Sequence, residues 1–347
     1  MPPKSRRDWS KPPLRVYEAN KRHMELIPSV SRSSGLDKDG DALRDFKVQQ
    51  EYRDFIQSKL DDYWRRFRSG NSSEDIKQRD EIQSNLLLLF RKLREGLQST
   101  KRMDAFSLEV YETSLWLSII FNSPAQTTAV VSHLLPSMYQ ALPDMHQNRM
   151  LTVLLSSLHF LAAGYPSQSR YFEHLHSLPS SFVPTQHAAL SWLSNLAKTL
   201  RMRNYSQLEA LTDHATCERV LTSIDRSRVD RATGKFDQRL PGSDLAFEAM
   251  CSLVGALRTK ARETTWLVLR SAYRELSLPK TTDADPASTR EWLYQSLALQ
   301  SVKPRGRESA AGEVASLDMW IETRCAKGDM RPREGIEGRW VIAKPKT

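Results

Sequence analysis

The sequence has few cysteines and few glycines, and both shortages narrow the possible chemistry. Cys217, Cys251 and Cys325 are odd in number and far apart, so they form neither a disulfide framework nor a CxxC pair of metal ligands. This pattern is typical of a reducing compartment, the cytosol or the nucleus. With 13 glycines in 347 residues, loops that cradle phosphate groups are scarce.

Motifs for catalysis are missing as well. The sequence contains no GxxxxGKS/T, GxSxG or HExxH, and no GxGxxG after a strand. His174 and His176 lie two positions apart, and on a helix such side chains point in nearly opposite directions, which is poor geometry for one metal ion. We therefore predict a protein that is not an enzyme, with no catalytic residues, cofactor or metal. An enzyme with an unrecognised site is the rival hypothesis.

Long hydrophobic runs are absent, and acidic residues are outnumbered by basic ones. The longest apolar run, "SLWLSIIF", is far shorter than the roughly 18 residues of a membrane span. The N-terminus lacks the apolar centre of a signal peptide. Net charge is +10, with 51 basic against 41 acidic residues. This excess favours polyanionic partners, although any basic soluble protein shares it.

The chain divides into three predicted regions. Residues 1–40 are rich in proline and serine, which predicts a flexible basic N-terminal arm. Residues 41–285 repeat apolar positions three and four apart in segments of about 10 to 20 residues, which predicts an array of paired helices. Within it, residues 225–244 carry five basic and four acidic side chains and are expected to form an exposed loop.

A different arrangement is predicted for the last region, residues 286–347. We expect helices over 286–300 and 312–327, followed by a hairpin built from "DMRPRE" and "GRWVIAK" around Gly335 and Gly338. Helix, turn, helix and hairpin is the order of a winged helix. A lone hairpin is marginally stable, so Trp340 and Ile342 are expected to share one face and pack on these helices. A tail of mixed polarity is the alternative.

The fold class predicted from the whole chain is all-α, a TPR-like helical-pair array that ends in a winged helix, which is the plan of the PCI module. Short segments resemble PCI proteins of the GANP, Sac-three and Thp-three type. "LEVYETSLWLSIIF" is similar to a helix of that family, as are "HLLPSMY", "LRMRNYSQLEAL" and "WLVLRSAYRELSLP". The likeness spans residues 45 to 345 and lies in helix patterns. The cysteine-containing lead-in of the long export scaffolds is missing, which favours a shorter relative.

The resemblance implies a scaffold subunit of a nuclear mRNA-biogenesis complex, found in the nucleus and also in the cytoplasm. Its expected partners are another PCI subunit, a small acidic Sem-one-like peptide, and RNA or single-stranded DNA bound weakly and without sequence preference. No membrane is involved. The alternative is a subunit of the proteasome lid or signalosome type that acts only through protein contacts.

Two sets of residues are candidates for binding. Basic side chains would contact phosphates, unless they form an ordinary solvated basic face, and apolar side chains near the end would contact a partner. The predicted nucleic-acid contacts are Arg305, Arg307, Arg324, Lys327, Arg331, Arg333 and Arg339, with Arg258, Lys260 and Arg262 as a second cluster. The predicted partner contacts are Trp320, Ile321, Trp340 and Ile342.

Overall fold

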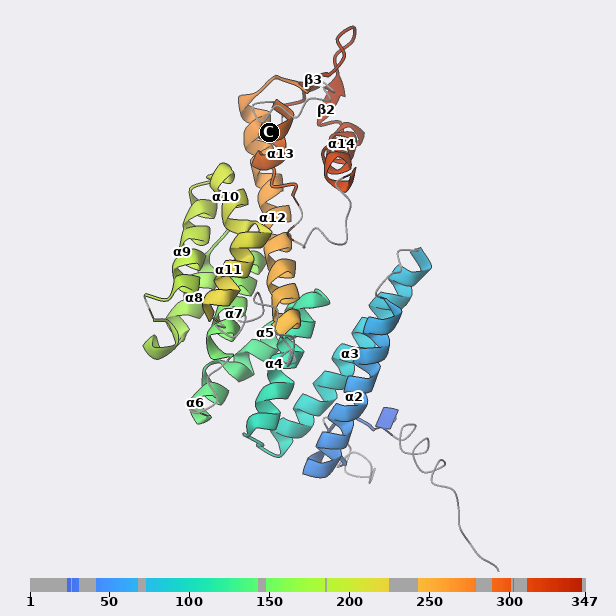
Figure 1. Cartoon of the computed structure of the whole chain (residues 1–347), viewed down its shortest axis with the longest axis vertical. Helices are drawn as coiled ribbons and strands as arrows, with labels where there is room; N and C mark the ends of the chain where they lie inside the picture. Colours follow the sequence, from blue (N-terminus) through green and yellow to red (C-terminus); the bar gives the residue numbers. More distant parts are fainter. Residues whose placement is uncertain are drawn as a thin grey trace, which may run out of the picture. The chain divides into compact units, whose positions relative to one another are not determined.

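The protein is mostly helical, with one small three-stranded sheet, in the part of the chain that the computed structural model describes (Figure 1). The all-α prediction is confirmed at this level. The expected N-terminal arm and the 225–244 loop lie almost wholly outside the described residues. The described ranges are 24–25, 27–30, 42–67, 73–142, 148–184, 186–224, 243–278, 289–300, 302 and 311–344.

The chain forms two compact units, residues 1–114 and 115–347, and each is described by itself. The first unit contains η2 (Ala42–Arg44), α2 (Phe46–Arg66), α3 (Ser73–Ser99) and the beginning of α4 (Ala105–Ile120). The second contains the rest of α4, α5 (Pro124–His133), the π-helical turn η3 (Leu134–Met138), α6 (Tyr139–Ala141), α7 (Arg149–Gly164), α8 (Ser169–Ser177), η4 (Ser180–Phe182), α9 (Ala188–Arg201), α10 (Tyr205–Thr212), α11 (His214–Ile224), α12 (Ser243–Ala272), β1 (Glu275–Ser277), α13 (Thr289–Ser296), α14 (Ala311–Ala326), β2 (Met330–Pro332) and β3 (Arg339–Ile342).

In the first unit, α2 and α3 pack as an antiparallel pair. The Asp45 carboxylate caps α2 by accepting from the N–H of Lys47 at 2.7 Å, which satisfies a donor that the helix itself leaves unpaired. The Gln49 side chain is fully buried at the same end. Its amide donates to the Leu43 carbonyl at 2.9 Å and to the Thr100 hydroxyl at 3.3 Å, so η2 and the end of α3 are both joined to α2.

Gly96 allows η2 to lie directly against α3. A Cβ atom at this position would come within 2.7 Å of the Leu43 carbonyl oxygen and 2.9 Å of the Leu43 Cβ. The backbone of η2 would have to move to relieve such a contact. Gly255, in the middle of α12, has no neighbouring atom within 4 Å of the position of a Cβ. A larger residue is therefore sterically restricted at Gly96 but not at Gly255.

Alanine substitution separates these two situations. We expect Gly96→Ala to destabilise the first unit by about 1–3 kcal/mol, because overpacking displaces the backbone of η2. We expect Gly255→Ala to stabilise the second unit by about 0.5–1 kcal/mol, because alanine loses less backbone freedom in a helix. Urea unfolding measures both changes, and a gain of stability in both variants would contradict the close approach at Gly96.

The helical layer of the second unit is centred on α7. This helix packs against α8 and α12, and its buried residues run along most of its length. The neighbouring helices α9, α10 and α11 pack on one another in chain order (Figure 1). Helices that follow one another in the chain thus pack together in this unit.

His159 is buried and His174 is partly buried in this layer. His159 is 4% exposed, and its Nε2 lies 2.9 Å from the Thr128 hydroxyl. The His174 Nε2 lies 2.9 Å from the Ser156 hydroxyl. Burial lowers the pKa of each histidine to about 4, and the positive charge of Lys260 contributes for His159. Both side chains are therefore neutral at pH 7.

Acid should destabilise the second unit through these two histidines. Their pKa is about 6.5 in an unfolded chain, so between pH 6.5 and 4 the unfolded state binds more protons than the folded state. Stability should therefore fall as the pH is lowered through this window, by about 1–2 kcal/mol per histidine at pH 5. In urea titrations at pH 7 and pH 5, the variant His159→Gln/His174→Gln should lose less stability than the wild type. An unchanged loss would show that other groups cause it.

Helix α12 is longer than the segments of about 10 to 20 residues predicted for this part of the chain. It continues from Ser243 to Ala272, and a strand, β1, follows it. Gly255 does not interrupt the helix, because packing of α12 on α7 outweighs the propensity cost of one glycine, about 1 kcal/mol. Strand β1 was not predicted.

The sheet has the order β1-β3-β2, and both pairings are antiparallel. The predicted hairpin is confirmed as β2 and β3, with Gly335 and Gly338 at positive φ in the connection. Leu276 of β1 lies opposite Trp340, and Met330 of β2 lies opposite Ile342. The inner face of the sheet thus packs on the helices, as predicted for Trp340 and Ile342. The core formed there contains Trp266, Leu269, Leu276, Leu278, Leu293, Leu297, Leu317, Trp320, Ile321, Met330 and Ile342.

Candidate partner and nucleic-acid interface

A glycine turn at the end of α14 fixes the start of the hairpin. Gly328 has φ of 72°, a left-handed conformation that glycine adopts without steric cost. Its N–H donates to the Cys325 carbonyl at 2.9 Å, and the N–H of Asp329 donates to the Arg324 carbonyl at 2.9 Å. These two bonds close a Schellman motif. The turn places the Asp329 side chain where it meets α12.

The Asp329 carboxylate joins α12, α14 and the sheet. Its Oδ2 accepts from the Trp266 indole N–H at 3.2 Å and from the Arg324 guanidinium at 3.4 Å. Its Oδ1 pairs with Arg270 at 2.8 Å. Arg270 also donates to the main-chain carbonyls of Ala343 and Lys344, just after β3. One carboxylate therefore satisfies donors from two helices, and one of those donors reaches the end of the sheet.

Arg324 is part of this core and does not reach the surface. The residue is 4% exposed, and its guanidinium lies 5.7 Å from the Trp266 ring centre and 5.2 Å from that of Trp320. It also pairs with the Glu263 carboxylate. Arg324 was predicted to contact nucleic acid, but its charge is already neutralised and enclosed by the two tryptophans. A phosphate has no access to it in this structure.

Removing the charge of Asp329 tests this arrangement. Asp329→Asn keeps the volume but removes the carboxylate that pairs with the partly buried Arg270 and one of the two that pair with the buried Arg324, so we expect a loss of about 2–3 kcal/mol in the free energy of unfolding. Asp318→Asn is the matched control, because Asp318 pairs with Arg290 at 2.7 Å and its side chain is 41% exposed. The control should cost less than about 1 kcal/mol. Urea unfolding of both variants measures the difference, and equal costs would contradict a central role for Asp329.

The side chains of the second predicted basic cluster donate hydrogen bonds to main-chain carbonyls. Arg258 is 2% exposed and donates to the Thr212 carbonyl at 3.2 Å. Arg262 donates to the carbonyls of two residues after α13, and Lys260 donates to the Ala162 carbonyl at 2.6 Å. Burial lowers the pKa of both arginines. These side chains connect α12 to its neighbours, and Arg258 in particular is not available to a phosphate.

The outer face of the sheet carries the exposed basic residues. Arg331 lies opposite Val341, and Arg339 lies opposite Ser277, so both side chains point away from the core. Neither has an ion-pair partner among the described residues. Arg333 is exposed too, but it pairs with the Glu275 carboxylate at 2.7 Å, which reduces the net charge of this face. We call Arg331, Arg333 and Arg339 the basic face. Lys327 is exposed beside it at the end of α14, whereas Arg305 and Arg307 lie outside the described residues.

The predicted partner contacts lie in the core. Trp320, Ile321 and Ile342 are between 3% and 8% exposed, and Trp340 is half-buried against the same cluster. The Trp320 ring meets the Trp266 ring edge to face, with centres 4.9 Å apart. Their apolar character is used inside this chain, so none of these four presents a large surface to a partner.

The structure exposes a different aromatic pair, which the sequence analysis missed. Tyr273, just after α12, is 44% exposed, and Trp292 on α13 is 38% exposed, with ring centres 5.6 Å apart. Large aromatic side chains that remain exposed together are enriched at protein interfaces. The sequence gives no clear signal for this exposure, because Trp320 and Ile321 are likewise adjacent on one helix and both are buried.

Comparison with known proteins adds no relative to this description. No protein-family model, curated protein or solved structure matches the chain. Among the described residues, no three His, Cys, Asp or Glu side chains are grouped so that they could hold a metal ion. No helix in the described ranges has the length and apolar character needed to cross a membrane.

Proposed function

We propose that the C-terminal part of the second unit is a winged helix. The supporting observation is its topology: α12, β1, α13, α14, β2 and β3 follow in this order, and the sheet order is β1-β3-β2. In this proposal β2 and β3 form the wing, and α14 takes the place of the recognition helix. The proposed module begins within α12, because Trp266 and Leu269 contribute to its core.

The second step of the proposal is that the chain is a non-enzymatic scaffold subunit of the PCI type, belonging to a nuclear mRNA-biogenesis complex. A helical layer that leads through one long helix into a winged helix is the plan of that module. The short sequence resemblances, such as "LEVYETSLWLSIIF", point to its GANP and Thp-three branch. Its partner would be a second PCI subunit, and a small acidic peptide could join the complex.

Nucleic-acid contact in this proposal is weak and does not read sequence. On α14 the exposed residues include Met319, Glu322 and Thr323, and the helix's described arginine, Arg324, is buried. Such a helix exposes few side chains that can hydrogen-bond to base edges in a major groove. The cations that remain available are on the basic face, where they would position phosphates. Few phosphate contacts mean low affinity that falls with salt.

A protein-only role is the alternative, and two observations favour it. Several of the predicted nucleic-acid contacts, including Arg258 and Arg324, are used within the fold. The exposed Tyr273 and Trp292 are better suited to a protein surface than to phosphates. In this alternative the chain is a proteasome-lid or signalosome type of subunit with no nucleic acid.

Co-purification with the double variant Tyr273→Ser/Trp292→Ser tests the scaffold role. We expect the wild type to recover one helical-repeat subunit in equal amount, and the double variant to lose it while keeping its circular dichroism. Phe46→Ser on α2 is the control, because Phe46 is 52% exposed in the first unit. Recovery of no stoichiometric partner by the wild type would contradict the proposal. Retention of the partner by the double variant would place the contact elsewhere.

Charge reversal on the wing tests the nucleic-acid part. Arg331→Glu/Arg339→Glu should weaken binding to a 30-nucleotide single-stranded RNA, because two phosphate contacts are lost. The slope of log affinity against log salt should become shallower by about 1.4, at about 0.7 per phosphate. Fluorescence anisotropy at several salt concentrations measures both quantities. The control, Lys47→Glu/Arg219→Glu, changes the same charge at two exposed helix positions that are not part of the sheet. If both variants behave alike, the protein-only alternative is favoured.

A further inference from the structure

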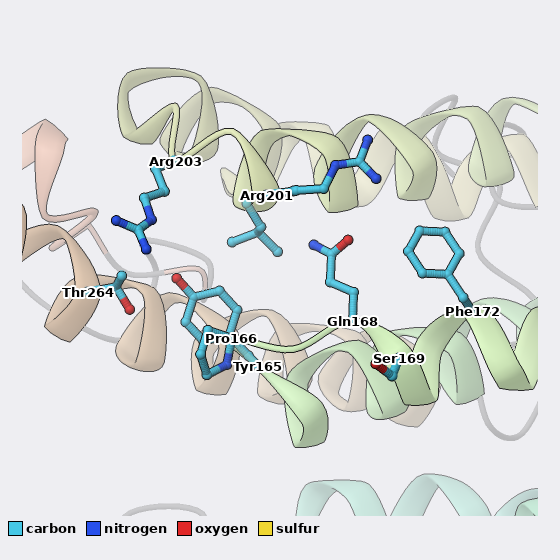
Figure 2. Close-up of a pocket in the computed structure, with 9 residues that line it drawn as sticks. Tyr165, Pro166, Gln168, Ser169, Phe172, Arg201, Arg203 and Thr264 are labelled. Atoms are coloured by element: carbon cyan, nitrogen blue, oxygen red, sulfur yellow. The ribbon is translucent and has the colours of Figure 1, made fainter.

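A pocket of about 350 Å³ lies in the helical layer (Figure 2). It lies between the start of α8 and the end of α9, with one wall completed by α12. Its size is at the lower end of the range for small-molecule sites. The lining contains no acidic residue. The lining residues are Tyr165, Pro166, Gln168, Ser169, Phe172, Leu200, Arg201, Arg203 and Thr264.

Two arginines line the pocket without a counter-ion. Arg201 and Arg203 are exposed, and no carboxylate of the described residues forms an ion pair with either. Figure 2 shows them at different ends: Arg203 extends toward Tyr165 and Thr264, and Arg201 extends toward Gln168 and Phe172. The pocket is therefore positive along its length.

Arg203 occupies a backbone position that normally favours glycine. Its φ is 53°, and its N–H donates to the Leu200 carbonyl while the N–H of Asn204 donates to that of Thr199. These are the bonds of a Schellman motif, in which glycine is the usual residue at the left-handed position. A side chain there costs stability. The strained position puts a guanidinium at the mouth of the pocket.

The opposite end of the pocket combines an aromatic ring with an unsatisfied acceptor. The Gln168 amide donates to the Ala197 carbonyl at 2.7 Å, which fixes its orientation. Its Oε1 is shielded from solvent and receives no hydrogen bond from the described residues. The Phe172 ring lies beside it in Figure 2 and is 38% exposed. A ligand that places a flat ring beside Phe172 would cover this exposed aromatic surface.

We propose that this pocket binds a nucleotide. The base would stack on Phe172 with the Arg201 guanidinium over its other face. The phosphate would lie at the other end, with Arg203 and the Tyr165 hydroxyl as donors. An acidic peptide would pair with the arginines but has no flat ring to place on Phe172, so the nucleotide accounts for more of the pocket.

The nucleotide could be one residue of a single-stranded RNA or a free mononucleotide. Both supply the same base, sugar and phosphate, and the pocket contacts described involve a single nucleotide. This inference goes beyond the proposed function, because it uses no residue of the basic face. It stands or falls independently of the winged helix.

Binding of labelled hexa-adenylate to the full chain tests the proposal, with fluorescence anisotropy as the readout. The wild type should bind, and Phe172→Leu should weaken binding about fivefold or more, because leucine keeps the apolar contact but removes stacking. Arg203→Gly should weaken binding to a similar extent while raising the urea midpoint, because glycine relieves the left-handed strain. This variant separates loss of binding from loss of folding. The control Lys198→Ala removes a charge one turn from Arg201 and should stay within about twofold.

Competition distinguishes the two sources of nucleotide. If AMP displaces the hexamer, the site takes a free nucleotide, and if AMP fails while the hexamer binds, the site takes a residue within a strand. Three results would overturn the proposal: no binding by the wild type, full displacement by hexa-glutamate, or unchanged affinity in both Phe172→Leu and Arg203→Gly. In the last case the variant Arg331→Glu/Arg339→Glu shows whether the basic face binds the hexamer instead.

Discussion

The C-terminal half of the second unit depends on one partly buried carboxylate. Asp329 accepts from Trp266 and pairs with Arg270 and Arg324, so α12, α14 and the sheet converge on a single group. Removing charges from water is expensive, and pairing each charge with a counter-charge offsets this cost. The glycine turn at Gly328 is what brings the carboxylate into position. The interior of this module thus includes charged groups beside its apolar core.

This polar interior explains why basic residues in the sequence overstate the basic surface. Arg258 and Arg324 contribute to the net charge of +10, yet both side chains are buried and make contacts within the fold. Helical spacing gave a usable signal for one of them. Arg258 lies four residues after Val254 and eight before Trp266, on the stripe of α12 that is buried. Charge composition alone cannot separate such residues from Arg331, whose exposure is decided by strand register.

Local patterns were sufficient to predict α13, α14 and the hairpin, but not β1 or the length of α12. The hairpin has its glycines and its β-branched residues in adjacent sequence, so its signal is local. Strand β1 has three residues and becomes a strand because β3, more than 60 residues later, pairs with it. Such pairing depends on tertiary packing and leaves little trace in a short segment. The pocket was not predicted for the same reason, since its walls come from α8, α9 and α12.

The continuity of α12 has a consequence for how the second unit unfolds. Its first half is buried with the helical layer, through residues such as Met250 and Val254, and its second half with the sheet, through Trp266 and Leu269. If α12 unfolds in one core, apolar surface of the other core becomes exposed. The two cores therefore unfold together in one cooperative transition. A fragment that ends before α13 would leave Trp266 and Leu276 without cover, so the sheet region is not a detachable domain.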